Sequence, residues 1–209
     1  NRRFGMNYTA GHIFPASGCA GAVAHALRAV TKPGDKVLVQ APFFPEYIPY
    51  INDTGAQIEI IPARFEDFQI NFEALEQMLQ PGVAAILINS PNNPSGVAYT
   101  GETLEKLSSL LAAKSKELGY NLFLISDEPY REIAFGGREI PYPARFYPHT
   151  LTCYSFSKSM SVPGERIGYV AVCPECEHAE DIVPMCGQIS RGIGHNCPSS
   201  LIQLAAAEA

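Results

Sequence analysis

The sequence predicts an α/β fold in which helices cover both faces of a mostly parallel central sheet, giving three layers. Two observations lead to this prediction. Short apolar segments of strand length alternate along the chain with amphipathic segments of helix length, which is typical of parallel βαβ units. The strand-like segments are apolar almost throughout, as expected for strands that are buried on both faces.

The expected elements follow from the period of the apolar residues and from the residues that bound each segment. Six short apolar runs predict strands at residues 37–40, 58–61, 84–89, 122–125, 153–157 and 169–173. Four longer segments predict helices at residues 20–30, 72–79, 103–118 and 175–189. Asn71 is a good N-cap for the second helix and Gly119 a natural end for the third, whereas Pro184 interrupts the pattern of the fourth.

The length and composition fit one folded domain. The chain has 209 residues, of which 46% are hydrophobic, enough for a large core. No apolar run approaches the ~18 residues that a membrane-spanning helix needs. The formal net charge is -6 and basic residues are scattered, so the sequence shows no basic patch for nucleic acid. We expect neither a membrane nor a nucleic-acid partner.

The six cysteines do not suggest a disulfide framework or a metal centre. A domain of this size with a full core does not need disulfides. Cys173 and Cys176 form a single C-x-x-C motif, but no second pair stands at the spacing of a zinc site. We therefore expect reduced thiols in a cytoplasmic protein, and no metal site.

In parallel α/β sheets, ligands bind beyond the carboxyl ends of the strands, so the residues after each apolar run are candidates for a site. The small residues Gly18, Cys19 and Ala20 precede a helix, whose free N–H groups bind anions; alternatively they form only a tight turn. The prolines of the loop at residues 90–96 stiffen it and allow Asn93 to be aimed at a ligand, although Asn-Pro is also common in plain turns.

Two later motifs place charged groups at strand ends. Asp127 follows a buried run, where a carboxylate requires a partner. It either pairs with a cationic ligand nitrogen, caps a helix N-terminus, or pairs with an arginine such as Arg131. Lys158 also follows an apolar run and would be a nucleophile for carbonyl groups. Arg166 together with serines suits a phosphate monoester, the alternative being a surface lysine and a structural arginine. Together these groups are what pyridoxal phosphate requires.

With these motifs the sequence resembles the class I and II aminotransferases of the aspartate aminotransferase type, which are fold type I pyridoxal-phosphate enzymes. The matching stretches are SPNNPSG (90–96), SDEPY (126–130), SFSK (155–158) and PGERIGY (163–169), with SGCAGA (17–22) and APFFPEY (41–47) as weaker support. The resemblance implies an enzyme that uses pyridoxal 5'-phosphate to move an amino group between an amino acid and a 2-oxo acid.

The resemblance also implies roles for individual residues. Lys158 would carry the cofactor as a Schiff base and shuttle the α-proton of the substrate. Asp127 would keep the pyridine nitrogen protonated, so that the ring acts as an electron sink. Tyr130 and Asn93 would hydrogen-bond the phenolic oxygen of the ring, and Asn93 would also contact the substrate. The remaining cofactor contacts would be the stacked ring of Phe44 and a phosphate clamp of Gly18, Cys19, Ala20, Ser155, Ser157 and Arg166.

Members of this family usually carry a second, smaller domain with an arginine for the substrate carboxylate. We therefore expect residues 1–209 to be the large, cofactor-binding domain, cut at both ends, without the small C-terminal domain and inactive alone. The full-length protein is expected to be a homodimer that acts on small molecules. Two alternatives stay open: a C–S β-lyase or related synthase on the same fold, and a non-catalytic aminotransferase-like regulatory domain.

Overall fold

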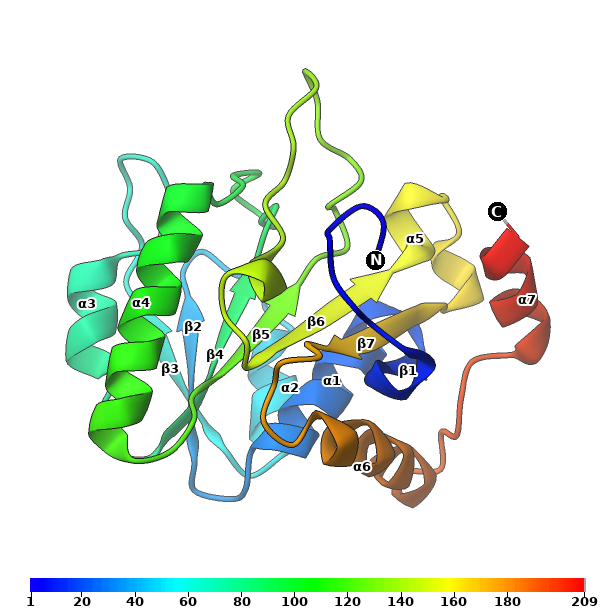
Figure 1. Cartoon of the computed structure of the whole chain (residues 1–209), viewed down its shortest axis with the longest axis horizontal. Coiled ribbons are helices and arrows are strands. Elements are labelled where there is room, and N and C mark those ends of the chain that lie inside the picture. The colour runs from blue at the N-terminus through cyan, green and yellow to red at the C-terminus, as the bar shows by residue number, and fades with distance from the viewer. Residues whose placement is uncertain (209) are drawn as a thin grey trace.

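A seven-stranded sheet forms the middle layer of the chain, whose computed structural model describes residues 1–208. The strands are β1 (Ile13–Ala16), β2 (Lys36–Gln40), β3 (Gln57–Ile61), β4 (Val83–Asn89), β5 (Phe123–Asp127), β6 (Thr150–Ser155) and β7 (Gly168–Val172). They lie side by side in the order β1-β7-β6-β5-β4-β2-β3 (Figure 1). The five strands from β3 to β6 run parallel, whereas β7 is antiparallel to both of its neighbours. The predicted α/β fold with a mostly parallel sheet is confirmed.

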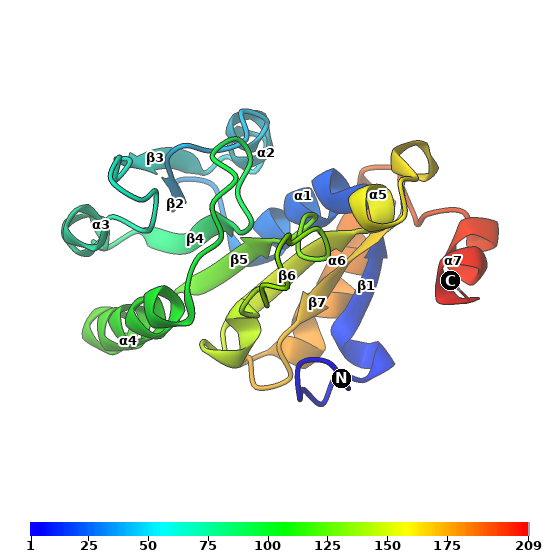
Figure 2. The same cartoon turned by 90° about the horizontal axis from the view of Figure 1, so that it is seen from above.

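The helices form the two outer layers. They are α1 (Gly18–Val30), α2 (Tyr47–Asn52), α3 (Phe72–Met78), α4 (Gly101–Leu118), α5 (Phe156–Ser159), α6 (Ala179–Gly192) and α7 (Ser200–Glu208), with short 3-10 turns at Ala10–His12, Pro143–Arg145 and Pro163–Glu165. Helices α1, α2 and α6 contribute to one apolar core, and α3 and α4 contribute to the other. Figure 2 shows α1 and α4 on opposite sides of the sheet.

Successive residues of the central strands supply the two cores. In β4, Ala85 and Leu87 belong to the core beneath α1, whereas Ile86 and Ile88 belong to the core beneath α4. Neighbouring side chains of a strand point to opposite faces, so a strand covered on both sides has to be apolar at every position. This is why the continuous apolar runs predicted strands correctly.

The predicted helix ends also have a local physical cause. The side chain of Asn71 accepts a hydrogen bond from the backbone N–H of Ala74 and so caps α3. Gly119 ends α4 in the left-handed conformation, at φ 79°, which costs glycine little because it has no Cβ. Pro184 lies inside α6 without ending it.

Several elements differ from the expectation. The segment predicted as a strand at residues 153–157 divides, because β6 ends at Ser155 and the one-turn helix α5 follows, so Lys158 lies on a helix. Helix α1 begins at Gly18, two residues earlier than predicted. Helix α6 begins only at Ala179, because a turn in which Cys176 N–H donates to the Cys173 carbonyl comes first. Neither β1 nor α2 was predicted.

Membrane spans, metal ligands and cysteines can be assessed over the described residues. Within residues 1–208, none of the helices combines the length and apolar character of a membrane span. In the same residues no cluster of three or more histidine, cysteine or acidic side chains has a geometry suited to a metal ion. The six cysteines are all free thiols.

Candidate active site

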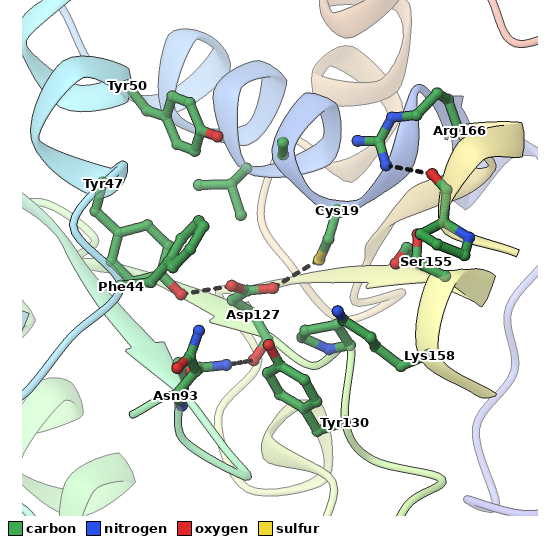
Figure 3. Close-up of a pocket in the computed structure, with 16 residues that line it drawn as sticks. Cys19, Phe44, Tyr47, Tyr50, Asn93, Asp127, Tyr130, Ser155, Lys158 and Arg166 are labelled. Carbon is green, nitrogen blue, oxygen red and sulfur yellow. Dashed lines mark hydrogen bonds between the residues drawn. The ribbon is translucent and has the colours of Figure 1, made fainter. Parts of the chain in front are cut away.

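A cavity of about 280 Å³ opens at the carboxyl ends of β4, β5 and β6, beside the first turn of α1 (Figure 3). Ten of the eleven residues predicted for the site line it: Cys19, Ala20, Phe44, Asn93, Asp127, Tyr130, Ser155, Ser157, Lys158 and Arg166. The eleventh, Gly18, lies directly behind Arg166. The fold therefore brings together residues from five separate segments of the sequence.

Asp127, the last residue of β5, is held by three neighbours. Tyr47 Oη donates a hydrogen bond to its Oδ2, and Cys19 Sγ donates to its Oδ1. The Asn89 side chain donates to the Asp127 backbone carbonyl at 2.9 Å. Burial raises the pKa of Asp127 to about 6, although the bonds from Cys19 and Tyr47 act in the opposite direction.

No cationic side chain in the described residues forms an ion pair with Asp127. Arg131, the alternative partner considered above, pairs with Glu128 at 2.9 Å, and both of these side chains are buried. The Asp127 carboxylate thus faces the cavity with uncharged donors only, and a cation placed in the cavity would stabilise its ionised form.

The amine of Lys158 enters the same cavity from α5. Figure 3 shows it directed towards Asp127, and its Nζ lies 5.8 Å from the centre of the Tyr130 ring. Burial raises the pKa of Tyr130, and the neighbouring amide of Asn93 opposes this effect. A local hydrogen bond stabilises the loop that carries Asn93, because the Asn93 N–H donates to Asn89 Oδ1 at 2.6 Å. The geometry gives an amine, a phenol and an amide in one cavity.

The other end of the cavity is suited to an anion. Arg166 donates hydrogen bonds to the backbone carbonyls of Pro163 and Ser17 at 3.0 and 3.2 Å, and so stands beside the start of α1. The Ser17 side chain makes no capping bond, which leaves N–H groups of the first turn free. Ser157 Oγ is buried and has no hydrogen-bond partner in the described part of the chain. A helix N-terminus with an adjacent guanidinium is a ready site for phosphate.

Close packing explains why residue 18 is a glycine. Its φ is +70°, and a Cβ at this position would lie 2.5 Å from Arg166 Nη2. A side chain would therefore both strain the backbone and displace the guanidinium. We call the end of the cavity formed by Arg166, Ser157 and the start of α1 the anion corner. Gly18 shapes this corner although it does not line the cavity.

The aromatic wall contains two residues that the sequence did not indicate. Phe44 was predicted, and its ring lies edge-on to that of Tyr47 with the centroids 5.8 Å apart. Tyr47 and Tyr50 of α2 also line the cavity. The spacing 44, 47, 50 is a helical period and was the available signal, but it did not reveal that Tyr47 reaches Asp127.

Comparison with known proteins gives consistent results. A sequence model of the family described as aminotransferase class I and II matches residues 3–209. A probable aspartate/prephenate aminotransferase of Aquifex aeolicus is 35% identical over 167 residues, covering 77% of this chain and 40% of the relative. A probable N-acetyl-LL-diaminopimelate aminotransferase of Bacillus subtilis is 30% identical over 205 residues, covering 98% and 49%.

Solved structures are similar over almost the whole chain. An aminotransferase from Eubacterium rectale has a TM-score of 0.95 at 43% identity, covering 97% of this chain and 51% of that one. An aspartate aminotransferase variant from Thermus thermophilus has a TM-score of 0.87 at 28% identity, covering 100% and 54%. The chain therefore spans about half the length of the proteins it matches.

Proposed function

The chain belongs to the aminotransferase class I and II family, and we propose that the whole protein moves an amino group from an amino acid to a 2-oxo acid with pyridoxal 5'-phosphate. One observation carries the proposal: the buried carboxylate of Asp127 enters the cavity from the end of β5, and the amine of Lys158 enters it from α5, which directly follows the neighbouring strand β6. The relatives named above are aminotransferases for aspartate, prephenate and N-acetyl-LL-diaminopimelate, which supports the reaction class.

The residues of the cavity fit this cofactor at both of its ends. Asp127 lacks a cationic partner among residues 1–208, and a protonated pyridine nitrogen is such a partner. The uncapped start of α1, the Arg166 guanidinium and the unpartnered Ser157 hydroxyl offer donors for a phosphate. Ser155 would add a further hydroxyl. Phe44 would lie against the ring, and Tyr130 and Asn93 would hydrogen-bond its phenolic oxygen.

The chemistry divides between the cofactor and the chain. When bound, the cofactor supplies an electron sink that stabilises negative charge on the substrate α-carbon. Lys158 Nζ would hold the cofactor and, as a free amine, would accept the proton from the substrate α-carbon. Asp127 would keep a proton on the ring nitrogen. Asn93 would orient the substrate carboxylate. The homodimer and the cytoplasmic location expected from the sequence stay predictions, and light scattering of the whole protein tests the first.

Replacement of Lys158 tests the function. In the whole protein, Lys158→Ala should abolish the absorbance band of covalently bound cofactor and lower turnover by at least about 100-fold, because the proton-transfer group is lost. Lys114→Ala is a matched control, because Lys114 pairs with the exposed Glu117 on α4, away from the cavity. The measurement is the absorbance spectrum, followed by amino exchange with a panel of amino and 2-oxo acids.

Three results would contradict the proposal. Full turnover in Lys158→Ala would remove Lys158 from the mechanism. Release of pyruvate and a thiol without any amino acceptor would instead identify the C–S β-lyase reaction. A protein that binds no pyridoxal phosphate would favour the regulatory alternative.

A further inference from the structure

The thiol of Cys19 makes a contact that the phosphate clamp does not explain. Cys19 lies in the first turn of α1, where its backbone borders the anion corner. Its side chain points the other way, towards Asp127 at the end of β5, as Figure 3 shows. Sγ approaches Asp127 Oδ1 across 108 residues of sequence. One residue thus connects the two ends of the cavity.

From this geometry we infer that Cys19 is a positioning residue, which donates its S–H to Asp127 and so fixes that carboxylate, ionised, against the cofactor ring. The inference rests on the proposed function, because it concerns the group that holds the proton of the ring nitrogen. Cys19 acts through Asp127 and does not itself take part in the reaction.

The direction of the hydrogen bond follows from burial and charge. Burial and the nearby Asp127 carboxylate raise the pKa of the Cys19 thiol well above its usual value. The thiol is therefore protonated at neutral pH and acts as the donor. A donor favours the ionised form of the acid that it contacts, so loss of the S–H shifts Asp127 towards its neutral form.

The other titratable groups near this contact do not replace Cys19. They are Tyr47 and Tyr50 on α2, Tyr130 after β5, Cys153 on β6 and Lys158 on α5. Burial raises the pKa of each of the three phenols and of the Cys153 thiol, so these groups stay neutral near pH 7. Tyr47 occupies Oδ2, which leaves Cys19 as the side chain on Oδ1.

An uncharged donor suits this position better than a cation. Lysine or arginine here would neutralise Asp127 and leave less attraction for a protonated ring nitrogen. The thiol fixes one oxygen of the carboxylate while its negative charge remains directed to the cavity. The arrangement holds Asp127 in place and preserves its charge for the cofactor.

Two variants of Cys19 separate donation from packing. Serine keeps a donor of similar size, and alanine removes it. In the whole protein, Cys19→Ala should weaken binding of pyridoxal phosphate to the apoprotein roughly threefold to tenfold, as expected for one hydrogen bond from the weak S–H donor. Cys19→Ser should bind the cofactor within about twofold of the unmodified protein, because the donor is kept. Cys186→Ala, buried in α6 away from the cavity, is the control for lost thiol volume.

The pH dependence gives a readout that packing alone would not change. Cys19 favours ionised Asp127. The pH at which the absorbance of the bound cofactor changes should therefore shift in Cys19→Ala, whereas in Cys19→Ser it should equal that of the unmodified protein. Cys186→Ala should leave that pH unchanged.

The contact can also be tested without cofactor. Burial is the largest cause of the raised pKa of Cys19, and the Asp127 charge is the next. In the apoprotein, Asp127→Asn removes that charge, so iodoacetamide should alkylate Cys19 at least about threefold faster at pH 8. Peptide mass spectrometry would follow Cys19 separately, with the exposed Cys197 as the internal reference.

The outcomes of these tests are distinct. Equal affinities and equal pH profiles for Cys19→Ala and Cys19→Ser would overturn the inference while leaving the proposed function intact. An unchanged alkylation rate in Asp127→Asn would overturn it as well. Failure of the unmodified protein to bind pyridoxal phosphate would overturn both the inference and the function on which it rests.

Discussion

Asp127 and Glu128 are consecutive acids at the end of β5, but their side chains have different partners. Asp127 contacts Tyr47 and Cys19 and lines the cavity. Glu128 is fully buried and pairs with Arg131. Burial raises the pKa of both acids, to about 6 and about 7, but only Glu128 has a cation that opposes the effect. Glu128 is thus a paired acid, whereas Asp127 has no cationic partner among residues 1–208.

The unpaired burial of Asp127 should destabilise the protein in the absence of cofactor. The ordinary pKa of this carboxyl is 3.8 and its folded value is about 6, so between these values the folded state holds the proton more tightly than the unfolded state. Stability therefore falls as the pH rises from about 4 to about 6, by roughly 2–3 kcal/mol in total.

Asp127→Asn should remove this cost, because asparagine carries no titrating proton and still accepts hydrogen bonds. We expect the apoprotein variant to be more stable at pH 8, and its advantage to grow by about 1 kcal/mol between pH 5 and pH 8. Urea unfolding at both pH values measures this, with the exposed Asp181→Asn as control. The same variant should bind pyridoxal phosphate poorly. An advantage that does not change with pH would contradict the assigned cause.

At the same scale, the sequence predicted residues that the structure brings into one cavity, but not their mutual contacts. Strand-end position indicated Asp127 and Lys158, since a charged group after an apolar run is unusual, and the sequence motif indicated Arg166. The hydrogen bond from Tyr47 to Asp127 spans 80 residues, and no periodicity within one segment reveals such a contact. The same holds for the Cys19 thiol.

At the scale of elements, the sequence predicted the strands that are buried on both faces. It missed the elements whose structure depends on tertiary contacts. The strands β2, β4 and β5 were found because each supplies buried residues to both apolar cores. Strand β1 is a four-residue segment containing Pro15 and, within residues 1–208, pairs only with β7. Its pairing, and the antiparallel direction of β7, come from tertiary contacts. Helix α5 was hidden in an apolar run because one turn is too short to show a period.

The start of α1 depends on a residue without a side chain. Gly18→Ala should strain a backbone at φ +70° and push aside the Arg166 guanidinium, because the added Cβ would lie 2.5 Å from Nη2. We expect a loss of about 1 kcal/mol of stability and roughly tenfold weaker binding of the cofactor phosphate. Calorimetry of phosphate and cofactor binding measures the second effect.

A matched glycine separates these two effects. Gly119 has φ +79° at the end of α4, and no atom lies within 4 Å of its Cβ position. Gly119→Ala should carry a similar conformational cost with no change in affinity. Equal affinity losses in the two variants would show that strain, and not displacement of Arg166, weakens binding.

On the scale of the whole molecule, the cavity draws on distant parts of the chain. Its walls come from the start of α1, the α2 region, the β4 loop, the end of β5 and the segment from β6 to Arg166. These segments are joined mainly through the sheet and α1. A ligand that contacts both the anion corner and Asp127 would therefore link elements that otherwise meet only through the core.

Pyridoxal phosphate should accordingly stabilise the whole protein as one unit. At a hundred times its dissociation constant, it should raise the free energy of unfolding by about 2.7 kcal/mol. At the same concentration, inorganic phosphate and pyridoxal each use only one end of the cavity, so their separate effects should sum to less than that of pyridoxal phosphate. Urea unfolding with each ligand measures this. In Arg166→Ala, pyridoxal phosphate and pyridoxal should stabilise the protein almost equally. If they already do so in the unmodified protein, the corner formed by Arg166 and the start of α1 does not bind the phosphate.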